Sequence, residues 1–458
     1  MREQKTIVSG LDLGSLFHFL QIVRAIKSAV HPARMLVALC MVLVLLASGS
    51  IWDSISSVDA TTLSSDQSQD ELQQLRTIAI AQAATSLGHI APEGSSYWTV
   101  IDAQHYLLAA WEDYVFEGDV AEKERLEFEQ IYVNLERVRR RGPFEASASF
   151  LSLQWNTIVD AGTHANAVQM WQGVVAIVWE LPQHLWRGGY HLFISLYGFL
   201  VVFVLCIGGG AIAQMEVRWH AHAERLSIAE AVRFSMHKWR ELLCVVCGPA
   251  MVVATLAICL MVMGLVLLNI PWLNMVGGVL YGGSLLLGFF LSVIAVGYAA
   301  CFPMLIPAMV VENETGSEAI CRVFSYVFAN MMRYIGYVFV LLVSLIIGYI
   351  VVRLIAMLTL DVTANLVGVG TFNNSLQGAG APQNGAIPAV GLVWYESSAG
   401  YLIQLWETIV RDLMIGWLFS AFFTGSTMLY LLMRKAYDSQ DTKDVCLCEA
   451  DSSTEKIS

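Results

Sequence analysis

The chain has 458 residues, of which 56% are hydrophobic and 14% are charged, and its mean hydropathy is positive. This composition lies outside the range of soluble globular proteins, so we expect a protein that folds in a membrane. The net charge of −12 is concentrated in residues 53–189, which contain nineteen acidic and eight basic side chains. Because such a surface repels phosphates, nucleic acid is excluded as a partner.

The N-terminal segment predicts a surface helix followed by a membrane anchor. In residues 1–34, apolar residues recur near helical spacing between basic ones, which is typical of a helix lying on the cytoplasmic membrane surface. Residues 35–52 form an apolar run that predicts the first transmembrane span. Its basic flank places the N-terminus in the cytoplasm. The run lies too far from the N-terminus for an ordinary secretory signal, so we interpret it as an uncleaved signal anchor.

Residues 53–189 contain no apolar run of span length and predict a small extracytoplasmic helical domain. Helices are expected over Ser68–Leu87, Trp98–Phe116 and Asp119–Arg141, the last one stopped by Gly142-Pro143. Alternating strand patterns are missing from this region, which favours helices over a sandwich. The segment Ala165–Trp186 turns apolar, and its tryptophans indicate an approach to the outer membrane interface.

The remaining spans fall in a membrane core at 190–433, and together with the first they predict an all-α, six-span helical bundle. We place them at about 190–213, 242–270, 275–300, 334–354 and 413–433. Five basic residues after the second span place that connection in the cytoplasm, together with the tail 434–458, whereas Leu354–Val410 contains no Lys or Arg and is interpreted as an external loop. Pro303 and Pro307 are predicted to break the helix after the fourth span.

Two cytoplasmic segments carry similar helix-start signals. Ser227-Ile228-Ala229-Glu230 predicts a capping box, and Thr315-Gly316-Ser317-Glu318 predicts a second one. Each precedes an amphipathic surface helix that leads into an outward span. With the N-terminal helix this gives three units of a surface helix and a helical hairpin. Duplication and shared physical requirements explain the three units equally well.

Several short motifs carry a resemblance to a known family. They are Glu312–Ala319, Arg322, Phe324–Phe328, Arg333-Tyr334, Glu230–Phe234 and Gly142–Glu145. In these motifs the chain resembles a family of uncharacterised multi-pass bacterial membrane proteins common in planctomycetes. The resemblance implies a bacterial membrane architecture, and it supplies no catalytic residue.

Small residues recur on the fourth predicted span. Gly278, Gly282, Ser284, Gly288 and Ser292 follow the spacing that allows two membrane helices to approach closely, and we interpret them as a helix-packing face rather than a pore lining. The sixth span has the same spacing of small residues in the pairs Gly416/Ser420 and Ala421/Gly425.

Few residues suggest chemistry. Arg353, Asp412 and Glu407 are expected near the outer ends of the fifth and sixth spans, and we interpret them as an interface ion pair rather than an ion-binding or gating site. His220, His222 and His237, and the cysteine pairs 244/247 and 446/448, lack the spacing of a metal site. No catalytic, cofactor-binding or metal-binding residue is therefore predicted.

These observations favour a non-enzymatic scaffold or accessory component of the bacterial inner membrane, with both termini cytoplasmic. Its expected partners are membrane lipids and other membrane or envelope proteins. The alternative is a permease or exporter-like protein for an uncharged or lipidic substrate, working through the segment around Pro303 and Pro307. A lipid-modifying enzyme is the third hypothesis.

Overall fold

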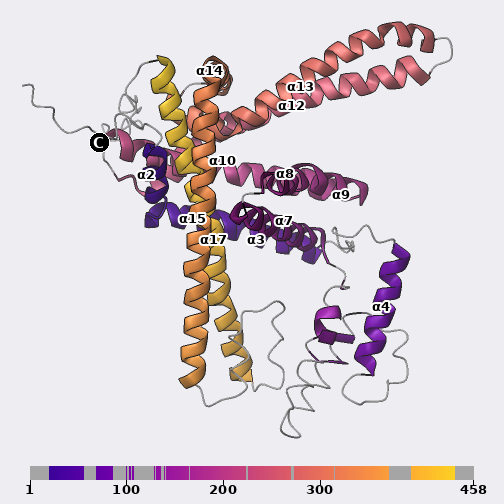
Figure 1. The fold of residues 1–458 in the computed structure, drawn as a ribbon, viewed down its shortest axis with the longest axis vertical. Helices are drawn as coiled ribbons and strands as arrows, with labels where there is room; N and C mark the ends of the chain where they lie inside the picture. Colours follow the sequence, from indigo (N-terminus) through magenta and orange to yellow (C-terminus); the bar gives the residue numbers. More distant parts are fainter. Residues whose placement is uncertain are drawn as a thin grey trace, which may run out of the picture. The chain divides into compact units, whose positions relative to one another are not determined.

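The computed structural model describes residues 20–55, 69–85, 100, 103–104, 106–107, 128, 130–135, 139, 141–164, 166–222, 225–269, 273–313, 315–370 and 394–438. In this part of the chain the regular elements are helices (Figure 1). The predicted all-α fold is confirmed.

Six helices of the described part are long and apolar enough to cross a membrane. They are α3 (Pro32–Ile55), α10 (His191–His222), α12 (Trp239–Asn269), α13 (Leu273–Glu312), α15 (Met331–Gly370) and α17 (Trp394–Asp438). Even the 24 residues of α3 exceed the length that a hydrocarbon layer of about 30 Å requires at about 1.5 Å per residue. The chain is therefore a multi-pass membrane protein, and most of its long helices extend well beyond the predicted spans.

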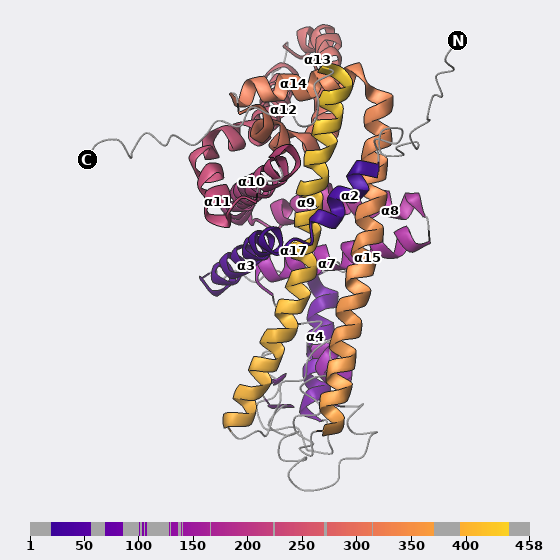
Figure 2. The ribbon, with the colours of Figure 1, turned by 90° about the vertical axis from the view of Figure 1, so that its left-hand side faces the viewer.

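The chain divides into two compact units. The first unit comprises Met1–Leu45, Gly198–Tyr349 and Ile415–Ser458, and the second comprises Leu46–Tyr197 and Ile350–Met414. In the first unit, the short helices α2 (Leu20–Ser28), α11 (Ile228–His237) and α14 (Gly316–Ala329) each precede a long helix. Figure 2 shows α11 beside α10, near the start of α12.

Helix α11 begins with the predicted capping box. The Glu230 backbone N–H donates to Ser227 Oγ at 3.3 Å, and the Ser227 N–H donates to Glu230 Oε2 at 3.2 Å. Ala231 and Ser235 are buried on one face of α11, while Arg233 is exposed. The prediction of an amphipathic helix with a serine cap is confirmed for this segment.

Helix α14 begins differently from the prediction. Thr315 occupies the cap position, but its hydroxyl donates to Glu318 Oε2 at 3.1 Å and makes no cap hydrogen bond. The Gly316 N–H instead donates to Glu241 Oε2 of α12 at 2.8 Å. The expected capping box is wrong because a carboxylate from a neighbouring helix satisfies the first amide of α14.

The predicted break at Pro303 and Pro307 is also wrong, because α13 continues through both prolines to Glu312. A proline removes one helical hydrogen bond and crowds the preceding turn, which disfavours an isolated helix. Here Met304, Leu305 and Ala308 are fully buried around the prolines. Tertiary packing therefore holds the helix together where local propensity opposes it.

Three consecutive glycines let α10 approach three neighbours. A Cβ at Gly208 would overlap Met41 of α3, and one at Gly209 would overlap the Phe423 ring of α17. A Cβ at Gly210 would lie 2.9 Å from Ser235 Oγ of α11. The first unit is thus assembled around a part of α10 that has no side chains in its way.

The predicted small-residue contacts of the sixth span are also present. A Cβ at Gly416 would lie 3.3 Å from the Leu39 backbone nitrogen of α3, and one at Gly425 would overlap Leu341 of α15. Ser420 Oγ donates to the Ala29 carbonyl at 2.8 Å. Helix α17 therefore packs closely through the positions that the sequence indicated.

The second unit contains α4 (Gln69–Ala84), which confirms the helix predicted over 68–87. Of the helix expected over 98–116, the described residues 100, 103–104 and 106–107 are helical; of the one over 119–141, residues 128 and 130–135 are helical and residue 139 is a bend. Residue 141 is described and is not helical, and the other positions of both predicted helices lie outside the described residues. A buried cluster joins these segments: Ala79, Ala83, Val100, Ala103, Leu107, Phe128 and Leu135.

Gly142-Pro143 marks the start of a helix, whereas residues 139 and 141 just before it are not helical. Pro143 is the first residue of α7 (Pro143–Thr163), a position where its missing N–H costs nothing. The Phe144 and Glu145 N–H groups donate to the two carboxylate oxygens of Asp53, at 2.9 and 2.8 Å. The last turn of α3 therefore caps α7. Beyond α7 lie α8 (Ala167–Val175), the π-helix η3 (Ala176–Glu180) and α9 (Leu181–Arg187).

Candidate functional site

The predicted packing face of the fourth span lies on α13. No described atom lies within 4 Å of a Cβ placed at Gly278, Gly282 or Gly288. Ser292 Oγ donates to the Gly288 carbonyl of its own helix at 2.9 Å, and Ser284 lines a cavity of about 220 Å³ between α12 and α13. The described helices leave these glycines open, and their contact with another helix remains a prediction.

The three residues of the predicted ion pair lie in the second unit. Arg353 donates to Asn156 Oδ1 of α7 at 3.3 Å, while Glu407 pairs with Arg411 one turn along α17 at 3.4 Å. The Asp412 residue is 6% exposed. In the structure Glu407 therefore pairs with Arg411, and Arg353 contacts α7.

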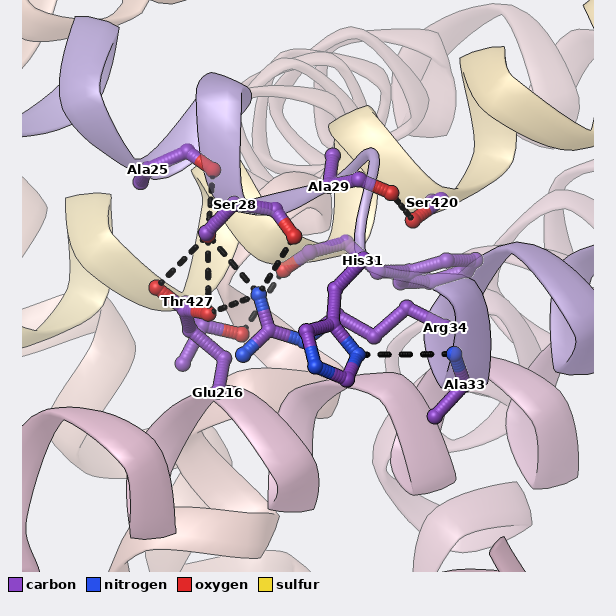
Figure 3. Close-up of polar contacts among 10 residues, drawn as sticks. Ala25, Ser28, Ala29, His31, Ala33, Arg34, Glu216, Ser420 and Thr427 are labelled. Atoms are coloured by element: carbon purple, nitrogen blue, oxygen red, sulfur yellow. Dashed lines mark hydrogen bonds and ion pairs between the residues drawn. The ribbon is translucent and has the colours of Figure 1, made fainter. Parts of the chain in front are cut away.

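The first unit contains a buried ion pair that the sequence analysis did not identify. Arg34 follows the turn between α2 and α3, and its Nη1 lies 2.5 Å from Glu216 Oε2 of α10. The side chains are only 5% and 2% exposed. Arg34 Nη1 also donates to the Ser28 carbonyl at 3.0 Å and to Ser28 Oγ at 2.7 Å (Figure 3). Buried charges are tolerated only with such partners, so this pair fixes α3 against α10.

A second buried carboxylate connects other helices of the first unit. Glu312, the last residue of α13, pairs with Arg322 of α14 and lies 3.3 Å from Arg434 Nε of α17. Tyr430 donates its hydroxyl to Glu312 Oε1 at 2.6 Å. One carboxylate thus connects three helices.

The tyrosine on α14 extends this network. Tyr326 donates its hydroxyl to the Asp438 carboxylate at the end of α17. Burial raises the pKa of the Tyr326 phenol, and the neighbouring Asp438 raises it further. The phenol therefore keeps its proton at neutral pH and remains a hydrogen-bond donor.

A basic cavity of about 220 Å³ adjoins the Arg34–Glu216 pair. Burial lowers the pKa of His31, and the nearby charges of Arg34 and Arg225 lower it further. His31 Nδ1 faces the Ala33 N–H at 3.4 Å, at the start of α3. The residues around the cavity are Lys27, Ser28, His31, Ala33, Arg34, Met215, Trp219, Arg225 and Leu226. The cavity is the part of the site that a ligand can reach.

The described part of the chain contains no metal site formed by the candidate ligands. Among the described residues, no group of three or more His, Cys, Asp or Glu side chains is arranged to hold a metal ion. Cys244 and Cys247 are free thiols, and the pair 446/448 lies outside the described residues.

The sequence contained a signal for both buried carboxylates. Glu216 and Glu312 are acidic residues at the ends of strongly apolar segments. The predicted spans end at 213 and 300, which places both residues beyond them. Because α10 and α13 continue past these limits, the two carboxylates lie in packed helical surroundings and need basic partners.

The fold and these contacts define the class of the protein: an all-α membrane protein with six candidate spans, in which buried ion pairs connect helices. The chain matches no protein-family model, and neither a curated protein nor a solved structure matches it.

Proposed function

We propose that the chain is a non-enzymatic scaffold or accessory protein of the bacterial inner membrane. Both termini lie in the cytoplasm, and residues 53–189 lie on the opposite side. The resemblance to the planctomycete-type family supports the bacterial membrane, and the basic residues between spans support this orientation. Membrane lipids and other membrane or envelope proteins are its partners.

The observation that carries the proposal is the pairing of buried carboxylates with arginines of other helices. Glu216 and Glu312 are paired with arginines from other helices, so they join helices to one another. In a transporter or membrane enzyme, buried ionisable groups commonly line a path for ions or substrate. Residues that are fully committed to connecting helices support a structural role instead.

The permease hypothesis is no longer supported by a helix break. It depended on a broken helix around Pro303 and Pro307, and α13 is continuous there. Meanwhile Gly278, Gly282 and Gly288 leave an open face on α13 where another membrane helix can approach closely. This open face favours association with a second membrane protein.

Affinity purification of the full chain in mild detergent tests the proposal. We expect stoichiometric co-purifying membrane or envelope proteins. Gly282→Leu and Gly288→Leu should release membrane partners that dock on α13, whereas Gly198→Leu, at another open glycine in α10, should retain them. Deletion of residues 53–189 should release envelope partners.

The contrary result is equally clear. A chain that purifies without any stoichiometric protein and that, after reconstitution into sealed vesicles, moves a small molecule or lipid across the bilayer contradicts the scaffold and supports a transporter. Size-exclusion chromatography of each variant shows whether the chain itself remains folded and monodisperse.

A further inference from the structure

The basic cavity beside Arg34 lies where two long helices end. Helix α3 starts at Pro32 and the candidate span of α10 ends at Ala221, so residues 31–34 and 215–219 lie at the ends of two spans. Side chains at this level meet the headgroup region of a membrane. Trp219, which is 41% exposed, has the amphipathic character common at this level.

The burial pattern of α2, the helix before α3, also places the cavity at the membrane surface. In α2, Ile22, Ala25 and Ile26 are buried while Arg24 and Lys27 are exposed, so one face packs on the protein and the other reaches water. Ser28 and His31 follow directly and line the cavity. The cavity is therefore formed at a corner between a surface helix and a span.

The charge around the cavity is positive. Lys27, Arg34 and Arg225 line it, and none of the described lining residues carries a carboxylate. Glu216 offsets the charge of Arg34 from within the protein. The Arg225 guanidinium lies 5.9 Å from the centre of the Trp219 ring, which holds it at the cavity edge. Lys27 and Arg225 are exposed and can reach a ligand that enters from the membrane surface.

The electrostatic potential in the cavity is consistent with its lining by basic residues. The lowered pKa of His31 reflects burial first and then the charges of Arg34 and Arg225. The first amides of α3 add the positive end of a helix dipole at Ala33. Figure 3 shows His31, Ala33 and Arg34 together at this corner.

The size of the cavity suits a small anion with its waters. A volume of about 220 Å³ holds several water molecules at roughly 30 Å³ each. Arginine offers planar, paired donors to phosphate oxygens and lysine offers a point charge, and this combination is typical of phosphate recognition. Basic pockets beside membrane helices commonly bind anionic headgroups.

We propose that this cavity binds a phosphate group, supplied by an anionic phospholipid headgroup or by free phosphate, with Lys27 and Arg225 as its direct ligands. The site is independent of the scaffold function, because it depends on the described residues of one chain and requires no protein partner.

Native mass spectrometry of the purified full chain tests this site. The protein is titrated in detergent with phosphatidylglycerol and, separately, with phosphatidylcholine of the same acyl chains. Phosphatidylglycerol should bind about tenfold more tightly, because the choline cation is repelled by the basic residues. The double variant Lys27→Gln/Arg225→Gln should lose about tenfold or more of this affinity.

Matched variants control for total charge. Arg233→Gln/Arg240→Gln removes two exposed cations outside the cavity and should change the affinity less than about twofold at moderate salt. Lys27→Arg/Arg225→Lys retains the charge and should retain most of the binding. Size-exclusion profiles must be the same for all variants.

A competition arm identifies the source of the phosphate. If millimolar inorganic phosphate leaves phosphatidylglycerol bound, the ligand is the lipid phosphodiester. If inorganic phosphate binds and displaces the lipid, the ligand is soluble phosphate and the site still stands. Equal binding of the two lipids together with no binding of inorganic phosphate, or equal loss in the Lys27/Arg225 and Arg233/Arg240 variants, overturns the proposal.

Discussion

Arg34 of α3 and Glu216 of α10 form an ion pair of 2.5 Å in which neither side chain is more than 5% exposed. Taking either charge out of water alone costs several kcal/mol, so the two residues must be buried together. Because Ser28 bonds to both side chains, the turn between α2 and α3 is fixed by the same contact. The pair therefore sets the geometry of the corner on which the phosphate cavity is built.

Removing the carboxylate should destabilise the protein. Glu216→Gln leaves Arg34 buried without a counter-charge, and we expect a loss of about 3 kcal/mol in the free energy of unfolding. The measurement is the midpoint of thermal unfolding in detergent, followed by fluorescence-detected size exclusion. Glu180→Gln, at an exposed position, should have little effect.

A second variant separates the missing charge from lost packing. Arg34→Met/Glu216→Leu replaces the pair with apolar groups of similar size and should recover most of the stability, because no unpaired charge remains. If Glu216→Gln is as stable as Glu180→Gln, the pair does not hold α3 against α10.

Gly209 and Gly198 provide a matched pair within α10. A Cβ at Gly209 would overlap the Phe423 ring, whereas no described atom lies within 4 Å of one at Gly198. Gly209→Ala should therefore lower stability by about 1–3 kcal/mol through overpacking. Gly198→Ala should be neutral or stabilise by up to about 1 kcal/mol, because alanine favours the helix. Equal thermal midpoints for the two variants would exclude a close α10–α17 contact.

Asp53 should be required for the start of α7. Asp53→Ala removes the acceptor for the Phe144 and Glu145 amides, with an expected loss of about 1–2 kcal/mol in local stability. Hydrogen exchange over residues 143–163 should become faster while exchange in the first unit is unchanged. Asp53→Asn keeps one acceptor oxygen and should have a smaller effect. Unchanged exchange in the alanine variant would show that α7 starts independently of α3.

The cap of α11 should depend on pH. A side-chain hydrogen bond with Ser227 lowers the pKa of the exposed Glu230 carboxyl, and a bond from the Ser227 backbone lowers it further. Since the folded pKa lies below the ordinary value of 4.5, the stabilisation is complete above pH 4.5 and is lost as the pH falls through the lowered value. The amide protection factors of residues 227–231 should decrease over that acidic range.

Glu230→Gln is the control for this titration. Its protection factors should be lower than those of the native chain at neutral pH and should not change with acidification. A native chain whose protection is constant down to pH 3 would contradict the role of the ionised carboxylate.

Local rules predicted much of this fold. The six spans follow from apolar length, and the cap of α11 follows from Ser227 and Glu230, because these features depend on neighbouring residues. The helix at Gln69–Ala84 was recognised for the same reason. The sequence also indicated close packing at Gly416 and Gly425, because small residues recur four positions apart in the pairs Gly416/Ser420 and Ala421/Gly425.

The remaining features depend on contacts between distant segments. Pro303 and Pro307 stay helical because surrounding side chains are buried, and Glu241 replaces Thr315 as the cap of α14 because α12 lies beside it. The partners of Arg34 and Glu312 come from helices far apart in the chain, so spacing alone did not reveal them. The candidate site was missed because it is formed by pairing across helices.

The most direct test of the six-span account is the sidedness of two single cysteines introduced into a chain that lacks the native ones. His164→Cys, between α7 and α8, lies between the first and second spans, and Ser317→Cys, in the first turn of α14, lies between the fourth and fifth. A membrane-impermeant maleimide added to sealed membrane vesicles of known orientation should label His164→Cys from one side only and Ser317→Cys from the opposite side only, the second being the cytoplasmic side in the proposed orientation. Labelling of both positions from the same side would contradict the six-span topology.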